Sequence, residues 1–483
     1  MPRENYIATI GLEVHAQLKT ESKIFSSDPA TYGAKPNTQV NPISLGHPGT
    51  LPKLNEKALE LAIKMGLACH SEITRVNRFA RKNYFYADLP KGYQISQDKT
   101  PICSGGYVSI KDAAGNDKKI NLVRIHMEED SGKSIHDLDP YNSLIDLNRA
   151  GVGLIEIVTE PEITDETEAY NYLSEIRKMV RYLDICDGNM EEGSLRCDAN
   201  ISVRKKGTDK LGQRTEVKNM NSLRNVQKAI SFEIDRQIEV LESGESVVME
   251  TRSFDAVRGT TFSMRSKEEA HDYRYFPEPD LQFVVVSEKE IEDVQVSMPR
   301  LPAERFSLYV NNYGLSEYDA SVLTERRETS DYFEAVISEN QNFKSAANWV
   351  MGPVRSYLNE NAVDMEDFHV SPSSIAQVIL LIDKGDISHS MAVQKLFPLM
   401  IDHPEVKVAD LAQKHDLIHH KDEDVVLEYV RNVLRDNPAE VERYRNGEKK
   451  LMGFFMGQLM KVSKGKVEPR SATEALKNEL EKS

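Results

Sequence analysis

The sequence predicts an α+β protein in which a mixed sheet-and-helix domain precedes helical domains. Before about residue 295, short β-rich stretches alternate with turn signals and helical stretches, whereas the later residues are almost entirely typical of helices. Pro299 and Pro302 mark the change, because proline lacks a backbone donor and restricts the residue before it. We therefore expect three domains: residues 1–295, a helical domain over 296–406 and a C-terminal tail domain over 407–483.

Four strand-like stretches in the first domain carry acidic or histidine side chains at positions where a strand usually carries apolar or small polar ones. They are Ile10–Gln17, Val123–Asp130, Gly153–Glu160 and Arg196–Arg204. Because side chains two residues apart share a face of a strand, each stretch has one polar face. The polar faces carry Glu13 with His15, Arg124 with His126 and Glu128, Glu156, and Arg196 with Asp198, Asn200, Ser202 and Arg204.

Glu156 is the strongest of these positions. Leu154 and Val158 flank it on its own face, and Ile155 and Ile157 occupy the other. A strand that is apolar on both faces is usually buried, and a buried carboxylate must be paired, hydrogen-bonded or bound to a metal. If the four stretches share one sheet, their polar side chains form a cation-binding surface on one face of that sheet. The alternative is that each polar face is solvated, as often happens in antiparallel sheets.

The stretch Phe79–Gln97 (FARKNYFYADLPKGYQISQ) combines alternating basic and tyrosine residues with a turn. Tyrosine can pack its ring and still offer a hydroxyl group. The stretch is therefore either a structural hairpin or a substrate loop in which Lys82 or Arg81 faces a phosphate or carboxylate.

Helical periodicity predicts helices over Asn55–Met65, Asp165–Leu183 and Ser222–Glu242 in the first domain, with Ser222 or Asn221 as the N-cap of the third. Ser371 and Pro372 form a further helix start, since serine caps and proline suits the first helical position. The other helices expected after the prolines are Ala303–Tyr313, Ser316–Glu325, Thr329–Glu339 and Ser345–Glu360.

Composition limits the possible function classes. With 61 basic and 77 acidic residues the chain has a formal charge of −16, which argues against extensive nucleic-acid coating but allows a local basic patch. The four cysteines have no C-x-x-C spacing, so we expect reduced thiols rather than disulfides or a zinc site. There is no hydrophobic signal region and no apolar run of membrane-spanning length. We expect a cytoplasmic protein with no membrane or DNA partner.

Several long motifs, in order along the chain, resemble the B-subunit family of aspartyl/glutamyl-tRNA amidotransferases. They include IGLEVHAQLKT, RKNYFYADLPKGYQISQ, HMEEDSGKS, DLNRAGVGLIEIVTEPEI, GSLRCDANISVR and, in the tail, NGEKKLMGFFMGQLMKVSKGK. The resemblance implies a cradle domain similar to glutamine synthetase. It implies an enzyme that uses ATP and Mg²⁺ to amidate misacylated Glu-tRNA(Gln) or Asp-tRNA(Asn). It also implies two partners, the amidase or A subunit, which supplies ammonia, and the small C subunit.

The resemblance also implies roles for individual residues. The metal ligands would be Glu13, His15, Glu128, Glu156 and Asp198. Strand parity favours Glu128 over Glu129, because Glu128 shares a face with His126, but the choice stays open. Lys82, Arg124 and Arg196 would stabilise the phosphate or acyl phosphate. Tyr84 and Ser194 are further substrate-contact candidates.

The tail holds a basic cluster, since residues 441–470 contain eight basic and three acidic residues, a net charge of +5. We expect Lys461, Lys464 and Lys466 to contact tRNA phosphates. The alternative is a packed helix with a solvated basic rim. The alternative for the whole chain is a non-catalytic, tRNA-binding adaptor, which would not need the buried Glu156 or the pair Glu13 and His15.

Overall fold

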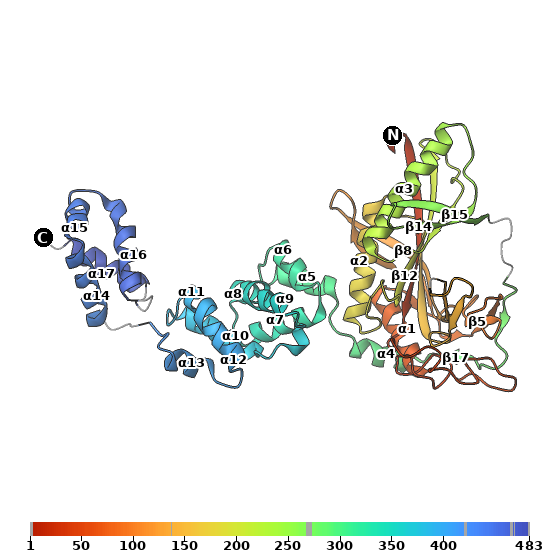
Figure 1. Cartoon of the computed structure of the whole chain (residues 1–483), viewed down its shortest axis with the longest axis horizontal. Coiled ribbons are helices and arrows are strands. Elements are labelled where there is room, and N and C mark those ends of the chain that lie inside the picture. The colour runs from red at the N-terminus through yellow and green to blue at the C-terminus, as the bar shows by residue number, and fades with distance from the viewer. Residues whose placement is uncertain are drawn as a thin grey trace. The chain divides into compact units, whose positions relative to one another are not determined.

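The computed structural model describes residues 3–136, 138–266, 273–419, 423–463, 467 and 469–481. The chain divides into two compact units, Met1–Leu301 and Pro302–Ser483. The first combines sheets with helices, and the second is helical (Figure 1). The predicted α+β class and its order along the chain are therefore confirmed.

The first unit is built on a ten-stranded sheet in the order β15-β14-β13-β12-β1-β11-β8-β6-β2, with β7 also paired to β8. At its centre lie β12 (Leu195–Lys205), β1 (Tyr6–Gln17), β11 (Gly153–Thr159) and β8 (Asp117–Glu129). These are the four stretches whose polar faces stand out in the sequence. They are consecutive antiparallel neighbours, so the expectation that they share one sheet is confirmed.

The remaining strands are short. In the large sheet they are β2 (Glu72–Ile73), β6 (Cys103–Ser104), β7 (Tyr107–Lys111), β13 (Thr215–Lys218), β14 (Glu250–Asp255) and β15 (Thr260–Ser266). Beside it, β4 (Ala80–Asn83) pairs with β5 (Tyr93–Ser96) and β16 (Phe276–Pro277). The stretch 79–97 is therefore a hairpin. Two further pairs join β9 (Lys133–Ile135) with β10 (Leu144–Asp146), and β3 (Val76–Asn77) with β17 (Val284–Val285).

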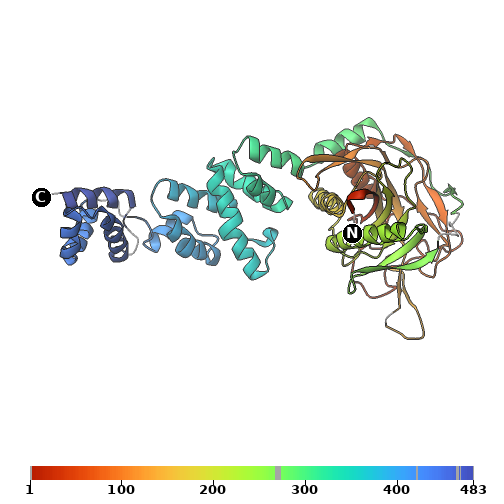
Figure 2. The ribbon, with the colours of Figure 1, turned by 90° about the horizontal axis from the view of Figure 1, so that it is seen from above.

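Alternation divides the central sheet into an apolar face and a polar one. Apolar side chains such as Leu12, Ile125, Ile157 and Ile201 are buried in a single core. Helices α1 (Glu56–Ala68), α2 (Glu166–Tyr182) and α3 (Leu223–Glu242) contribute to the same core, and Figure 2 shows α2 and α3 lying side by side. The opposite face is left for polar side chains.

The three helices begin where the sequence predicts. The side chains of Asn55, Asp165 and Ser222 each accept a hydrogen bond from a backbone N–H of the first turn. Such caps satisfy donors that have no partner within the helix. A fourth helix, α4 (Glu288–Ser297), ends the unit just before the proline-rich break.

The second unit contains two separate hydrophobic cores. Helices α5–α13 build the first: Pro302–Asn311, Glu317–Leu323, Arg327–Glu339, Phe343–Trp349, Arg355–Asn361, Pro372–Asp383, His389–Met391, Phe397–Asp402 and Val408–Lys414. Helices α14–α17 build the second: Glu423–Asp436, Pro438–Arg445, Met452–Val462 and Pro469–Glu481. None of the helices in the described ranges is both long and apolar enough to cross a membrane.

One predicted helix differs in detail. The sequence predicts a continuous helix over Ser345–Glu360, but a π-helical turn, Val350–Val354, separates α8 from α9. Pro353 lies inside that turn. Proline removes one backbone donor and clashes with the preceding turn of a regular helix, so a locally widened turn accommodates it.

Candidate active site

The polar side chains of the four central strands form rows across the sheet, because the strand register places them directly opposite one another. His15 faces Arg196 on one side and Glu156 on the other, and Glu156 faces His126. Two residues before His15 in β1, Glu13 lies opposite Asp198 of β12. The hydrogen-bonded backbone of the sheet therefore fixes the spacing of the site.

The first group of potential ligands joins His15, Glu128 and Glu156, each with one ligand atom within 4.8 Å of the others. The Oε2 atom of Glu156 lies 3.3 Å from Nε2 of His15 and 3.4 Å from Nε2 of His126. Glu156, Glu128 and His126 are buried. The burial expected for Glu156 is confirmed, and its carboxylate is paired with two imidazoles.

The pKa values of the two histidines are shifted in opposite directions. Burial opposes a charge on His15, but the Glu156 carboxylate raises the pKa of this imidazole above its usual value. At His126 the effect of burial exceeds the opposing effect of the Glu156 and Glu128 carboxylates, so the pKa of this imidazole is lowered. Burial also opposes ionisation of Glu156, yet the two imidazoles lower the pKa of Glu156. These shifts favour the ionised form of Glu156 and a proton on His15 rather than on His126.

The second group joins Glu13, Asp198 and Glu216, again within 4.8 Å of one another. Burial raises the pKa of Glu13, and the neighbouring carboxylates of Glu156 and Asp198 raise it further. Lys218 partly compensates, since its ammonium group pairs with Asp198 and lies 3.2 Å from Glu216. The group thus concentrates acidic side chains on the polar face of the central sheet.

Glu128 and Glu129 point to different surroundings. Glu128 belongs to the first group, whereas Glu129 pairs with Lys91 and accepts a 2.8 Å hydrogen bond from the backbone N–H of Ile95. The geometry therefore favours Glu128 as the ligand and gives Glu129 a structural partner.

The three predicted cations lie in different environments. Nζ of Lys82 lies 3.7 Å from Oε2 of Glu128 and 5.2 Å from the ring centre of Tyr273. Burial opposes its charge, but Glu128 and other nearby groups raise the pKa of Lys82. Arg124 donates a 3.2 Å hydrogen bond to the backbone oxygen of Asp98.

Arg196 is already engaged by a carboxylate. Its guanidinium group donates a 2.8 Å hydrogen bond to Asp130, which also accepts from Gln17 and lies near Arg149. Burial disfavours the charge on Asp130, but the two arginines hold its pKa at about 2. Arg196 is thus placed at the rim of the row by an ion pair that the sequence does not indicate.

The remaining predicted contacts lie around and beyond this face. Tyr84 donates a 2.5 Å hydrogen bond to Gln94. Ser194 closes the loop before β12, since its hydroxyl bonds Asp187 and donates a 2.9 Å bond to the backbone oxygen of Asn189. Lys461 is exposed on α16. Lys464 and Lys466 lie outside the described residues.

The sequence analysis misses Glu216 and also the contact of His126 with Glu156. Glu216 lies on a strand of only four residues, and its carboxylate reaches the site because β13 pairs with β12. A short polar alternation, Thr215 to Lys218, is the only local signal. His126 is visible as a polar-face residue, yet its contact with Glu156 depends on the register between β8 and β11.

The donor atoms present suit a divalent cation. Carboxylate oxygens are the preferred ligands of Mg²⁺, and imidazole is compatible with the related transition metals. Oε2 of Glu128 and Nδ1 of His126 are buried and have no hydrogen-bond partner among the described residues. A cation would satisfy the carboxylate oxygen, which burial otherwise leaves unbonded.

Comparison with known proteins supplies the family. Residues 8–292 match the family model of the GatB/GatE catalytic domain, and residues 331–480 match that of the GatB domain. The chain belongs to the GatB family. The site described above lies within the range that matches the catalytic domain of the family.

Curated members of the GatB family match the chain over almost its full length. It is 50% identical over 471 residues to the B subunit of the aspartyl/glutamyl-tRNA(Asn/Gln) amidotransferase of Thermodesulfovibrio yellowstonii, covering 98% of each chain. It is 49% identical over 479 residues to the protein of the same name from Geobacter sulfurreducens, covering 99% of each. The Caldicellulosiruptor bescii protein of that name is 47% identical over 483 residues, again with 99% coverage.

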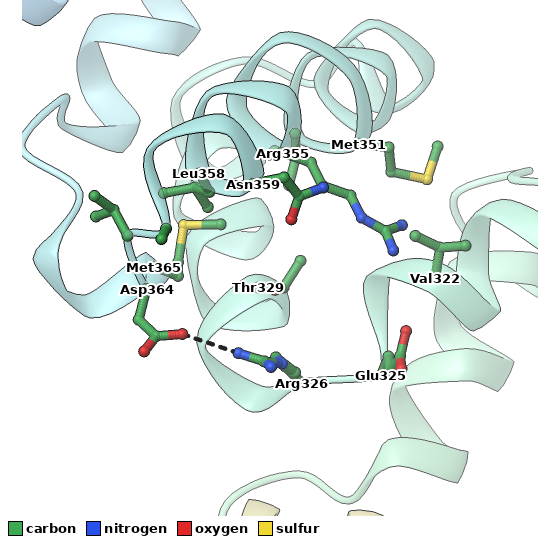
Figure 3. A pocket seen from close by; sticks show the side chains of 13 residues that line it. Val322, Glu325, Arg326, Thr329, Met351, Arg355, Leu358, Asn359, Asp364 and Met365 are labelled. Atoms are coloured by element: carbon green, nitrogen blue, oxygen red, sulfur yellow. Dashed lines mark hydrogen bonds and ion pairs between the residues drawn. The ribbon is translucent and has the colours of Figure 1, made fainter.

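A cavity of about 450 Å³ lies in the second unit, away from these ligand groups in the sequence. It is lined by α6, the start of α7, the π-helical turn and α9 (Figure 3). Arg326 and Asp364 form an ion pair of 3.1 Å across one side, and Arg355 projects near Met351 and Val322. Among the described residues, the potential metal-ligand groups lie on the sheet and not in the lining of this cavity.

Proposed function

We propose that this chain is the B subunit of a tRNA-dependent amidotransferase, an ATP-dependent ligase that converts Glu-tRNA(Gln), Asp-tRNA(Asn) or both to the amidated forms. The observation that carries the proposal is the pair of carboxylate-rich ligand groups on the polar face of the central sheet, in a chain of this family. We place the reaction in the cytoplasm, where aminoacyl-tRNAs are made and used.

The reaction has two steps. An oxygen of the side-chain carboxylate attacks the γ-phosphorus of ATP, and ADP leaves. Ammonia then attacks the acyl carbon, and phosphate leaves. Bound Mg²⁺ would supply neutralisation of the phosphate charge. In this proposal the first group (His15, Glu128, Glu156) and the second group (Glu13, Asp198, Glu216) hold the cations.

The chain's own cations bind and orient the anionic substrates. Lys82 is half-buried beside Glu128, which raises its pKa, so its ammonium group is placed to stabilise charge that develops on a transferred phosphoryl group. Arg124 lies on the same face as His126 and Glu128 and has the same proposed role. Arg196 is held in place by its ion pair with Asp130. In this proposal its positive charge attracts the anionic substrate from the rim of the row.

The proposed assembly includes the amidase or A subunit, which releases ammonia from glutamine, and the small C subunit. The B subunit receives that ammonia at the activated acyl group. Added ammonium salt should therefore replace glutamine in an assay of the assembled complex, which separates the chemistry of this chain from that of the amidase.

The test measures amidation of each misacylated tRNA by the complex, with ammonium chloride as nitrogen donor. Glu156→Gln and Asp198→Asn should each reduce the rate by about 100-fold or more, since loss of even an outer-shell partner costs about 10- to 100-fold. Glu72→Gln, an exposed glutamate on β2, is the matched control. Binding of tRNA and unfolding should stay unchanged in all three.

Near-normal amidation by both site variants at ordinary Mg²⁺ would remove the proposed site. If the wild-type complex binds misacylated tRNA but hydrolyses no ATP in response, the adaptor function would replace the enzymatic one.

A further inference from the structure

A small basic and aromatic notch lies on the first unit, where β4 and β16 pair. Its volume is about 60 Å³, and its lining includes Arg78, Lys99, Thr100, Tyr275 and Phe276. Tyr275 is 39% exposed and Phe276 44% exposed. Among the described residues, the side chains of Arg78 and Lys99 form no ion pair, although the nearby Arg81 is held by Glu278 and Asp280.

Two residues of the notch lining, Tyr275 and Asp98, lie next to residues of the candidate active site. Tyr275 lines the notch, yet its hydroxyl also lies close enough to the site to interact electrostatically with Lys82, Glu128 and Glu156. Burial raises the pKa of Tyr275 to about 12, and the two carboxylates add to the shift while Lys82 opposes it. Asp98, which also lines the notch, accepts the hydrogen bond of Arg124 through its backbone oxygen. A ligand in the notch would therefore adjoin the row of metal ligands.

The chemistry of the notch fits one nucleotide of a single strand. Aromatic faces stack on bases, and unpaired basic side chains bind the phosphate that follows. A volume of about 60 Å³ admits a phosphate group rather than a whole nucleotide, so the base would lie outside, against the exposed rings. Asp98 carries one negative charge, and Arg78 and Lys99, which form no ion pair with the described residues, together carry two positive charges.

We propose that this notch binds the single-stranded 3′ end of the RNA substrate, with a terminal base against Tyr275 and Phe276 and a phosphate between Arg78 and Lys99. The inference rests on the proposed function. It explains why the notch opens beside the site, since the amino acid to be amidated is esterified to that end. ATP also offers a base and phosphates, but its phosphates must reach the metal groups rather than the outer notch.

The test compares binding of two deacylated tRNAs to the assembled complex by fluorescence anisotropy, one intact and one lacking its last three nucleotides. Truncation should weaken binding to the wild type about tenfold, the order expected for one stacked base. The pair Tyr275→Leu with Phe276→Leu should bind intact tRNA about tenfold more weakly and truncated tRNA as the wild type does. Arg78→Gln with Lys99→Gln should act similarly and flatten the salt dependence by up to about two units of slope.

The matched control is Lys205→Gln with Lys206→Gln, which removes the same charge from two exposed residues at the far end of β12. It should leave the difference between the two tRNAs intact. Equal weakening of both tRNAs by the notch variants would overturn the inference. So would a rise in the KM for ATP with unchanged tRNA binding. Because binding of deacylated RNA is the readout, the result does not depend on amidation.

Discussion

Glu128 and Glu129 are neighbours in the chain but lie on opposite faces of β8, because successive side chains of a strand alternate. Glu128 lies close to two other potential ligands and has a buried oxygen without a hydrogen-bond partner among the described residues. Glu129 is paired with Lys91 and with the backbone of Ile95. The same substitution at the two positions should therefore have opposite consequences.

We expect Glu129→Gln to lower the free energy of unfolding by about 3 kcal/mol, because it leaves the largely buried Lys91 ammonium without its partner. Glu128→Gln should lower stability less, because its contact with Lys82 is a 3.7 Å ion pair beyond hydrogen-bond distance, and should weaken divalent-ion affinity about tenfold or more. Urea unfolding and Mn²⁺ titration by electron paramagnetic resonance measure the two quantities. Equal effects of both substitutions on Mn²⁺ affinity would contradict the assignment.

A second buried residue, Lys23, makes stability depend on pH. Its ammonium group donates a 2.7 Å hydrogen bond to the backbone oxygen of Gln39. Burial lowers the pKa of Lys23 to about 8, although Asp28 opposes the shift. The unfolded chain keeps this proton until about pH 10.4. Between those values the unfolded state binds more protons, so this residue makes stability rise with pH.

Relative to Lys23→Met, the wild type should therefore gain stability as pH increases from 8 to about 10, by about 2–3 kcal/mol at most. Below pH 8 the cost of the buried charge is fully present in the wild type. Urea unfolding of both proteins at pH 7, 8.5 and 10, followed by circular dichroism, gives the difference. A difference independent of pH would show that the Lys23 pKa is ordinary.

At the scale of the elements, helix starts follow local sequence, whereas strand partners do not. Asn55, Asp165, Ser222 and Ser371 each cap a helix that the sequence predicts. Capping depends on residues within one turn, so local sequence is enough. Glu216 escapes because its strand is short and its pairing with β12 is a tertiary contact. The sequence analysis also misses the π-helical turn Val350–Val354, because hydrophobic periodicity does not reveal a single widened turn.

The cap of α3 offers a matched test. Ser222 accepts a hydrogen bond from the backbone N–H of Asn225, whereas Asn221 accepts only from the side chain of Asn225. Ser222→Ala should therefore lower the free energy of unfolding by about 1 kcal/mol, and Asn221→Ala by much less. Thermal or urea unfolding measures both. Equal losses would mean that Asn221 shares the capping role.

At the scale of the whole molecule, alternation in the sequence predicted which side chains share a face, and the sheet brought those faces together. Glu13, His15, Glu128, Glu156 and Asp198 all lie in the two ligand groups. The pairing of Arg196 with Asp130 could not be predicted, because it joins residues 66 positions apart. Tail binding of RNA stays a prediction.

Deleting the tail tests its expected contact with tRNA, and the cores of the second unit determine where the deletion can begin. Val408, Leu411 and Ala412 of α13 are buried in the first core of the second unit, so a deletion from residue 407 would expose that core. Deleting residues 420–483 instead should raise the KM for tRNA much more than that for ATP. Reversing the charge of Lys461, Lys464 and Lys466 together should flatten the salt dependence of tRNA binding by up to about one unit of slope per lost phosphate contact. An unchanged slope would make this cluster an ordinary solvated surface.

The rows across β12, β1, β11 and β8 have a consequence for how the protein responds to heat. The proposed ligands lie on strands that pair in a hydrogen-bonded ladder, rather than on loops that move independently. The spacing of the ligands can change only when the ladder separates. Warming should therefore leave the affinity for metal nearly constant until the first unit melts, and then abolish it in the same transition.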